Sequence, residues 1–424
     1  MSKLLGWIDD RFPLTALWKS QVSEYYAPKN FNFWYYFGSL AAFVLVLQIV
    51  TGIFLTMNYK PDAAKAFESV EYIMRDVQWG WLIRYMHSTG ASMFFIVVYL
   101  HMFRGLLYGS YRKPRELTWI FGCLIYLCLM AEAFFGYLLP WGNMSYWGAQ
   151  VIVSLFGAIP GIGNGLSELI RGDFYISDIT LNRFFAFHVI ALPLVLVGLV
   201  AAHLMALHET GSNNPDGVEI KKQPKDPVTG LPLDGIYSHP YYTVKDIVGV
   251  IVFLVVFSIV VFFLPEMGGY FIEANNFIPA DPLKTPEHIA PVWYFTPYYA
   301  MLRAVPSFMG TQVWGVIIMG VSVMIFFAMP WLDRGAVKSI RYRGGLYKAW
   351  LAAFVVAFLI LGYLGVVPVT VWGQFREAFP FYGADKATVV ARVLTVVYFL
   401  FFLLMPWYTA RDKTKPVPAR VVWK

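Results

Sequence analysis

Charged residues are scarce in this sequence. Only 14% of its 424 residues are Asp, Glu, Lys or Arg, whereas 58% are hydrophobic. Because soluble chains carry roughly 25% charged residues, the composition excludes an ordinary soluble enzyme and predicts a membrane protein. The formal net charge of +7 does not indicate nucleic-acid binding, since the basic residues lie in short segments between apolar runs, a pattern that reports membrane topology. We therefore expect contact with membrane lipid and no nucleic-acid partner.

Cysteine is nearly absent as well. Cys123 and Cys128 lie five residues apart in one apolar run. This excludes a disulfide framework, a CxxC motif and the CxxCH motif of covalent haem attachment. The first 30 residues also lack a short apolar core followed by a cleavage site, so we expect no cleaved signal peptide.

Apolar runs, in contrast, are abundant. Eight of them are long enough to cross roughly 30 Å of hydrocarbon, so we predict an all-α, polytopic membrane protein with eight transmembrane helices. An even number places both termini on one side. About 22 of the 33 basic residues lie in segments assigned to that side, which predicts cytoplasmic termini. The runs are residues 34–57, 79–108, 117–138, 179–208, 247–264, 311–331, 348–367 and 389–409.

Four of the seven histidines form two pairs inside these runs: His87 with His101, and His188 with His203. An ionisable side chain in a membrane span is costly, so two such pairs indicate a functional site. At about 1.5 Å and 100° per residue, gaps of 14 and 15 residues place both members on one helix face, about 21 to 22 Å apart. If the two helices face each other, the histidines form two stacked sites with two imidazoles each. Haem, which takes two axial ligands, suits such sites.

Two connections between the runs are too long for simple turns. Residues 139–173 are amphipathic and contain several glycines and aromatics, and residues 265–310 are rich in proline and aromatics. Unstructured loops of this length are uncommon unless they have a function. We therefore expect amphipathic surface helices in both connections, on the side opposite the termini.

Several sequence motifs together resemble cytochrome b of the quinol:cytochrome c oxidoreductase (cytochrome bc complex) family. They are RYMH and HMFRGLLYGSYR in the second run, GYLLPWGNMSYWGA after the third, RFFAFH and HLMALHETGSNNP in the fourth, and PVWY followed by YYAMLRAVP. The resemblance covers nearly the whole chain. Its eight-helix length points away from the shorter, split form found in photosynthetic complexes.

The resemblance implies an enzyme subunit that oxidises quinol at an outer site and reduces quinone, expected to be ubiquinone, at an inner site. Two non-covalent b-type haems would connect the sites: His87 and His188 would hold the outer, low-potential haem, and His101 and His203 the inner, high-potential one. An iron–sulfur (Rieske-type) protein and a c-type cytochrome would be partners, because this chain has no cysteine cluster of its own. A homodimeric complex in a bacterial inner membrane is expected.

The implied layout has four parts. Residues 1–33 would form an N-terminal interfacial segment, 34–210 a dihaem four-helix bundle, and 211–246 a cytoplasmic connection. Residues 247–424 would form the C-terminal helices, with the outer quinol-site loop at 265–310.

Glycines and arginines accompany the histidines. Two glycine pairs repeat the 14-residue interval of the first histidine pair, so flat rings could pack where a Cβ is missing, although small residues also serve ordinary helix packing in membranes. Three arginines flank the histidines at helix ends, where they could pair with haem propionates or simply extend to the interface. The residues concerned are Gly38, Gly52, Gly122, Gly136, Arg84, Arg104 and Arg183.

The resemblance also implies quinone-site residues, each of which could instead be a packing or surface residue. At the outer site they are Tyr137, Met144, Gly148, Pro291, Tyr294, Phe295 and Tyr299. At the inner site His208 and Asp246 would bind quinone and deliver protons, with Lys245, Ser212 and Asn213 beside them.

The chain departs from the family pattern at two points. The usual PEWY motif is PVWY here, so Val292 replaces a carboxylate that takes a quinol proton, and Glu287, His288 or Tyr146 is expected to substitute for it. The second histidine gap is 15 residues instead of 14, and Pro193 follows His188 closely. We predict a local wide turn that absorbs the added residue and returns His203 to the haem.

Two other classes of membrane protein are alternatives to this interpretation. A transporter could use buried His and Asp as a proton relay, but it would need neither the paired intervals nor the matched glycines. A different dihaem membrane anchor would need no long outer connections of this kind.

Overall fold

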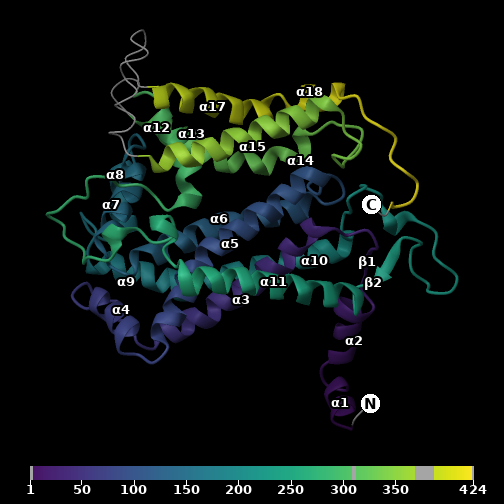
Figure 1. Cartoon of the computed structure of the whole chain (residues 1–424), viewed down its shortest axis with the longest axis horizontal. Coiled ribbons are helices and arrows are strands. Elements are labelled where there is room, and N and C mark those ends of the chain that lie inside the picture. The colour runs from purple at the N-terminus through teal and green to yellow at the C-terminus, as the bar shows by residue number, and fades with distance from the viewer. Residues whose placement is uncertain (1–2, 308–311, 368–385, 423–424) are drawn as a thin grey trace.

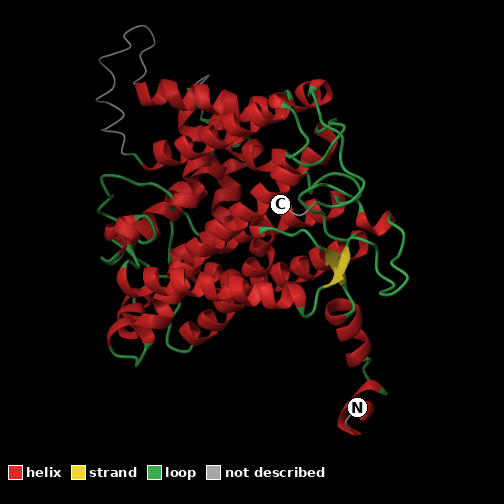
Figure 2. Cartoon of the chain, turned by 45° about the vertical axis from the view of Figure 1, so that its right-hand side comes forward, coloured by secondary structure: helices red, strands yellow, loops and turns green. Residues whose placement is uncertain are grey.

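The computed structural model describes residues 3–307, 312–367 and 386–422 (Figure 1). The end of the predicted loop at 308–310 and the first residue of the predicted sixth span, Thr311, lie outside the described residues. The described chain is mostly helical, with loops and one short pair of strands (Figure 2). Seven of its helices are long and apolar enough to span a membrane, or eight if one bent pair counts as a single span, in agreement with the predicted polytopic fold.

The first four spans form the bundle that contains the paired histidines. They are α3 (Tyr36–Thr56, continuing from the 3₁₀ turn η2, Phe33–Tyr35), α5 (Gly80–Tyr108), α6 (Glu116–Leu138), and a composite span made of α9 (Asp178–Ala186), the π turn η3 (Phe187–Ala191) and α10 (Leu192–Thr210). Within the bundle α3 packs on α5 and α6 on α10.

The remaining spans form a second layer beyond α5 and α6, except for α11 (Tyr241–Phe263), which packs on α3 and α5 (Figure 1). In that layer are α13 (Val313–Met324), η8 (Ile325–Ala328), α14 (Met329–Leu332), α15 (Gly345–Val366), α17 (Lys386–Leu403) and α18 (Met405–Arg411). The last predicted span, 389–409, is not straight: α17 and α18 meet at 60°. Pro406 lies in the first turn of α18, where its ring is tolerated at the start of a helix but not inside one.

The outer connections are structured and joined to each other. The segment after α6 contains α7 (Asn143–Gly157) and α8 (Gly163–Arg171), as predicted. The segment after α11 contains the 3₁₀ turns η5 (Met267–Gly269), η6 (Ala274–Asn276) and η7 (Trp293–Phe295), followed by α12 (Thr296–Ala304). Helix α12 corrects the expected surface helix: six of its nine residues are buried, because it packs between α13, α15 and α17.

The other end of the bundle carries shorter elements. They are α1 (Lys3–Asp9), α2 (Leu14–Trp18), the π turn η1 (Lys19–Ser23), the 3₁₀ turn η4 (Ile220–Lys222), and the strands β1 (Tyr26–Pro28) and β2 (Gly235–Tyr237), which pair antiparallel. The strand pair and helix α4 (Ala66–Arg75), in the first connection, were not predicted. The predicted cytoplasmic connection 211–246 is shorter than expected, because α11 already begins at Tyr241.

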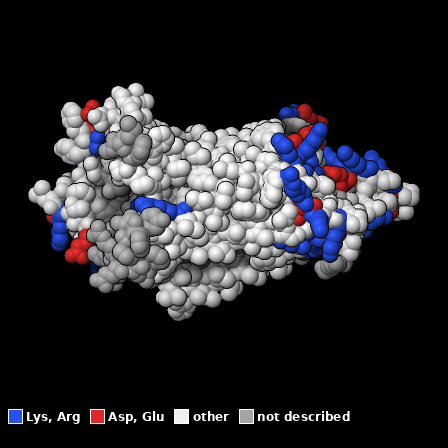
Figure 3. Space-filling view, turned by 90° about the horizontal axis from the view of Figure 1, so that it is seen from above, with Lys and Arg blue, Asp and Glu red and all other residues white. Residues whose placement is uncertain are grey.

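The surface divides into a broad band without charge and two charged ends (Figure 3). Lys and Arg are most numerous at the end where both described termini lie (Figures 1 and 3). Large apolar side chains of the membrane-spanning helices α10 and α11 are also exposed, among them Leu194, Met205 and Phe262. This distribution fits helices that face lipid and a basic end that faces the cytoplasm.

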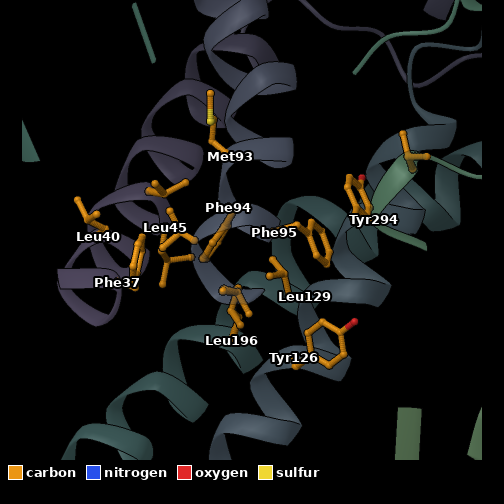
Figure 4. Packing of buried hydrophobic residues seen from close by; sticks show 14 of the residues in the cluster. Phe37, Leu40, Leu45, Met93, Phe94, Phe95, Tyr126, Leu129, Leu196 and Tyr294 are labelled. Carbon is orange, nitrogen blue, oxygen red and sulfur yellow. The ribbon is translucent and has the colours of Figure 1, made fainter. Parts of the chain in front are cut away.

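An apolar layer lies halfway between the two histidine levels. Leu45, Phe94 and Leu129 are midway between the members of the glycine and histidine pairs on their helices, and Leu196 is near the middle of its own. All four are buried in one core cluster (Figure 4). The two histidine levels are therefore separated by a packed, low-dielectric layer.

Candidate functional site

The structure brings the four histidines together as two facing pairs. The ring centroids of His87 and His188, the outer pair, are 6.1 Å apart, and those of His101 and His203, the inner pair, are 6.3 Å apart. A metal-bound imidazole nitrogen lies roughly 2 Å from its metal, so two imidazoles on opposite sides of one iron have centroids roughly 6 Å apart. Both pairs therefore fit the axial ligands of a haem.

A π-helical turn lies beside His188. It spans Phe187–Ala191 and ends two residues before Pro193. Proline cannot donate the usual backbone hydrogen bond four residues back, and a π turn accommodates one residue more than an α turn. The extra residue in the 15-residue gap is thus absorbed, and His203 still faces His101. The predicted distortion is present.

Each of the four paired glycines faces one histidine ring. An added Cβ would lie 3.2 Å from His101 at Gly38, 3.3 Å from His87 at Gly52, 3.4 Å from His203 at Gly122, and 2.4 Å from His188 at Gly136. The sequence predicts that these glycines make room for flat haem rings. In the structure their nearest neighbours are the imidazoles, so the glycines fix how closely each histidine can approach its helix.

Three of the four imidazoles have a fixed acceptor at Nδ1. His188 is 2.9 Å from the Glu132 carbonyl oxygen, His203 is 2.8 Å from the Thr118 carbonyl oxygen, and His87 is 2.9 Å from the Thr51 hydroxyl. Such a partner holds the proton on Nδ1 and leaves Nε2 free to bind metal. Nδ1 of His101 is buried and has no hydrogen-bond partner among the described residues.

Glu132 is a site residue that the sequence analysis missed. Its carboxylate Oε1 lies 3.0 Å from Nδ1 of His188, in addition to the backbone contact. One feature of the sequence could have identified it: Glu132 is the only charged residue in the run 117–138. An ionisable residue inside a membrane span indicates function.

If His188 is an axial ligand of a haem, as the sequence predicts, we expect Glu132→Gln to raise the midpoint potential of that haem. A carboxylate acceptor makes the imidazole a stronger donor and stabilises the oxidised iron. A hydrogen bond to a charged group exceeds a neutral one by about 1 kcal/mol, which corresponds to about 40 mV for one electron. Redox titration followed by absorption spectra measures the change, with the inner haem as the internal control. An unchanged outer potential would contradict this role.

One cavity of about 280 Å³ joins the outer histidine pair to the PVWY segment. His87, His188, Gly52, Gly136 and Arg84 line one part of it. Tyr137, Val292 and Tyr294 line another, together with the unpredicted residues Phe271 and Glu273. A flat, mostly apolar ligand with a few polar groups suits such a space.

The PVWY segment is held firmly beside this cavity. Tyr294 stacks on Phe95 of α5 with ring centroids 3.9 Å apart (Figure 4). The Tyr294 carbonyl accepts a 2.5 Å hydrogen bond from Tyr99, and the Trp293 indole donates to Ser92 at 3.1 Å. Since all three partners belong to α5, the helix that also carries His87 positions this wall of the cavity.

The other predicted outer residues lie behind the cavity wall. Gly148 packs behind Tyr137, where an added Cβ would be 3.3 Å from the ring. Tyr146 packs edge-on against Trp141, and Tyr299 lies under the guanidinium of Arg303. None of these residues lines the cavity, nor do Met144, Pro291 and Phe295.

The proposed substitutes for the missing carboxylate are not at the cavity either. Glu287 is exposed. His288 is engaged through Nε2 with the Val366 carbonyl oxygen at 3.0 Å. The structure does not bring these two residues or Tyr146 to the place where Val292 replaces the usual glutamate.

The three arginines differ in their positions. Arg84 lines the outer cavity one turn before His87. Arg104 lies one turn after His101, with its guanidinium over the Tyr35 ring, and its Nε has no hydrogen-bond partner in the described part of the chain. Arg183 is exposed and donates to the Leu169 carbonyl at 2.7 Å, where it closes the last turn of α8. Arg84 and Arg104 fit haem propionates; Arg183 is placed outside the cavity.

The predicted inner residues surround the N-terminal segment. His208 stacks on Tyr25 and contacts the Gln21 side chain at 2.6 Å. Asp246 interacts with Ser39, next to Gly38, and Lys245 donates to the Phe31 carbonyl at 3.3 Å. These residues lie on α10 and α11, in the neighbourhood of the inner pair.

Ser212 and Asn213 follow α10. Asn213 is buried and donates to the Tyr108 carbonyl at 2.7 Å, so it anchors the end of α5. Ser212 beside it is only partly buried.

Two pairs of imidazoles at two depths of one helical bundle are typical of integral membrane electron-transfer proteins. Residues 22–211 match the family model described as Cytochrome b/b6/petB, and residues 279–399 the one described as Cytochrome b(C-terminal)/b6/petD. The chain is 62% identical over 419 residues to a cytochrome b of Allochromatium vinosum, with 98% of each chain covered. It is 45% identical over 424 residues to a cytochrome b of Rhodospirillum rubrum, covering 99% of this chain and 96% of the relative.

A solved structure of a hyperthermophilic respiratory complex III contains a similar chain. The TM-score is 0.83 at 36% identity, over 96% of this chain and 98% of that chain. The protein therefore belongs to the cytochrome b family. It is a multi-span membrane protein that binds b-type haem, and the catalytic membrane subunit of a quinol:cytochrome c oxidoreductase.

Proposed function

We propose that this chain oxidises quinol at an outer site and reduces quinone, expected to be ubiquinone, at an inner site. The observation that carries the proposal is the single cavity lined by both the outer histidine pair and the PVWY segment. A quinol head bound between Tyr137 and Tyr294 would lie in the same space as His188. Electron transfer from quinol to a haem at the outer pair would then need no further carrier.

The two histidine pairs are proposed to hold two b-type haems, the outer on His87 and His188 and the inner on His101 and His203. When bound, the haems supply one-electron redox centres at two depths of the membrane. The chain orients their ligands through the Nδ1 acceptors and the four glycines. Its apolar middle layer excludes water between the two levels.

At the inner site His208 and Asp246 are proposed to bind quinone and supply its protons. Both are polar side chains at the ends of otherwise apolar spans near the inner pair. His208 lies in the last turn of α10 and Asp246 near the start of α11, and Lys and Arg gather at the end of the molecule where both described termini lie (Figures 1 and 3). We therefore place the inner site and the termini on the cytoplasmic side of a bacterial inner membrane.

The partners are proposed from the chemistry and from the complex III relative. Quinol gives up two electrons, and the haem path across the membrane takes one of them. The other needs a separate acceptor, an iron–sulfur (Rieske-type) protein, which passes it to a c-type cytochrome subunit. Within the described residues no group of three or more His, Cys, Asp or Glu could hold a metal cluster. A homodimeric complex is expected, as in the family.

The experiment is quinol-driven haem reduction in the purified complex. With an inhibitor of the inner site present, quinol should reduce one b-type haem, which stays reduced because its electron has no exit. Reduction of the c-type cytochrome should accompany it. No haem reduction by quinol under these conditions would overturn the proposed function.

A further inference from the structure

We propose that Glu273 accepts the quinol proton at the outer site, the role that Val292 cannot fill. This inference rests on the proposed function and adds a catalytic residue to it. Two observations point to Glu273: it lines the cavity shared by His188 and Tyr294, and its Oε2 accepts a 3.0 Å hydrogen bond from the Tyr137 hydroxyl. The side chain therefore stands in the space where the quinol head would bind.

The position of Glu273 is fixed by the start of α7. Asn276 donates its backbone N–H to the Glu273 carbonyl at 2.9 Å, and the Asn276 side chain accepts the Ser145 backbone N–H at 2.9 Å. The Asn143 backbone N–H donates to the Ile278 carbonyl at 2.9 Å. The segment that carries Glu273 is thus attached to α7, a helix of the other outer connection, through the last residue of η6 and through Ile278 after it, and the Glu273 carboxylate accepts the hydrogen bond from Tyr137.

Glu273 also lies next to exposed residues of the outer connection. It is partly buried, whereas the next two residues, Ala274 and Asn275, are exposed. A carboxylate between a buried cavity and the outer surface can take a proton on one side and release it on the other. Glu287, exposed on the loop, and His288, engaged with the end of α15, have no such position.

The electrostatic surroundings suit this role. Burial raises the pKa of Glu273 to about 7, and the hydrogen bond from Tyr137 opposes part of that rise. Tyr137 and Tyr294 are the titratable groups nearest to it. The same cavity also contains Arg84, Glu132, His87 and His188. A proton acceptor works best when its pKa lies near the operating pH.

The proton step balances without any further reagent. The O–H bond of quinol breaks, and an O–H bond forms on a Glu273 carboxylate oxygen. One electron leaves with each of the two protons to a one-electron acceptor of the quinol:cytochrome c reaction, and Glu273 passes the first proton to water outside before it accepts the second. Tyr137 acts as a positioning residue, because it orients the carboxylate without itself taking the proton.

The test compares Glu273→Gln with Glu266→Gln, an exposed carboxylate of the same connection, in the whole complex. Glutamine keeps the shape of Glu273 and an acceptor for Tyr137 but cannot take a proton. Quinol oxidation should fall on the order of 100-fold, the lower range for general-base catalysis, with haem content and both midpoint potentials unchanged. The control should keep full turnover, and Val292→Glu added to Glu273→Gln should restore much of it.

The pH profile gives a second readout. In the unaltered complex turnover should rise as the pH increases through about 7, because Glu273 must be ionised to accept a proton, and Glu273→Gln should abolish that limb. The inference would be overturned if Glu273→Gln kept full turnover with an unchanged pH profile, or if it lost a haem, in a preparation whose unaltered complex still oxidises quinol. Failure of the unaltered complex to reduce its haems with quinol would instead reject the proposed function itself.

Discussion

Inserting one alanine after Ile190 abolishes the inner haem, whereas deleting Ile190 leaves both haems in place. The π turn Phe187–Ala191 already absorbs one residue beyond the 14-residue interval. A 16-residue gap would turn His203 about 100° away from His101, and one π turn cannot absorb two added residues. The deletion restores the interval of the first pair, for which a regular helix is sufficient. Ile190 is 60% exposed, so neither change disturbs the core directly.

Absorption spectra during redox titration measure this result as the number of b-type components. Two components are expected for the deletion and one for the insertion. An insertion variant with both haems intact would show that the π turn does not set the direction of His203.

Gly136→Ala displaces His188 and removes or strongly weakens the outer haem. An added Cβ at Gly136 would lie 2.4 Å from Cε1 and 2.8 Å from Nδ1 of His188, distances at which the ring must move. That movement would also break the contacts of His188 with Glu132. Loss of an axial ligand weakens haem binding directly, an effect far larger than the stability change of within about 0.5 kcal/mol that is usual for a surface substitution.

Two matched variants serve as controls. At Gly122 the added Cβ would be 3.4 Å from His203, an ordinary contact, and at Gly198 of α10 nothing lies within 4 Å. Both alanine variants should keep two haems in pyridine haemochrome assays. Equal haem loss in Gly122→Ala and Gly136→Ala would mean that close packing against the imidazole is not the cause.

Much of the bundle could be predicted from the sequence because its physical constraints are local. Hydrocarbon thickness sets the length of each apolar run, and the runs agree with the helices within a few residues. The histidine and glycine intervals are properties of single helices. Even the π turn could be predicted, since one added residue and Pro193 leave few alternatives for a helix that must present His188 and His203 on one face.

The outer site could not be predicted in the same way, because it forms between distant segments. Glu273 and Tyr137 are 136 residues apart, and Glu273 follows an apolar stretch in a loop that also holds the equally plausible Glu266 and Glu287. The buried position of α12 depends likewise on its packing against α13, α15 and α17. Arg183 shows the opposite limit of sequence patterns. Its position near a histidine suggested contact with a haem, but in the structure its guanidinium donates to the Leu169 carbonyl at the end of α8.

The most direct test of the two paired histidine sites is the haem complement of the purified protein, measured by redox titration of its absorption spectrum with and without His188→Leu. We predict two non-covalent b-type haems per chain with different midpoint potentials, and loss of the outer component alone in the variant, because His101 and His203 remain paired. A single haem in the unaltered protein, or an unchanged pair of haems in His188→Leu, would contradict this prediction.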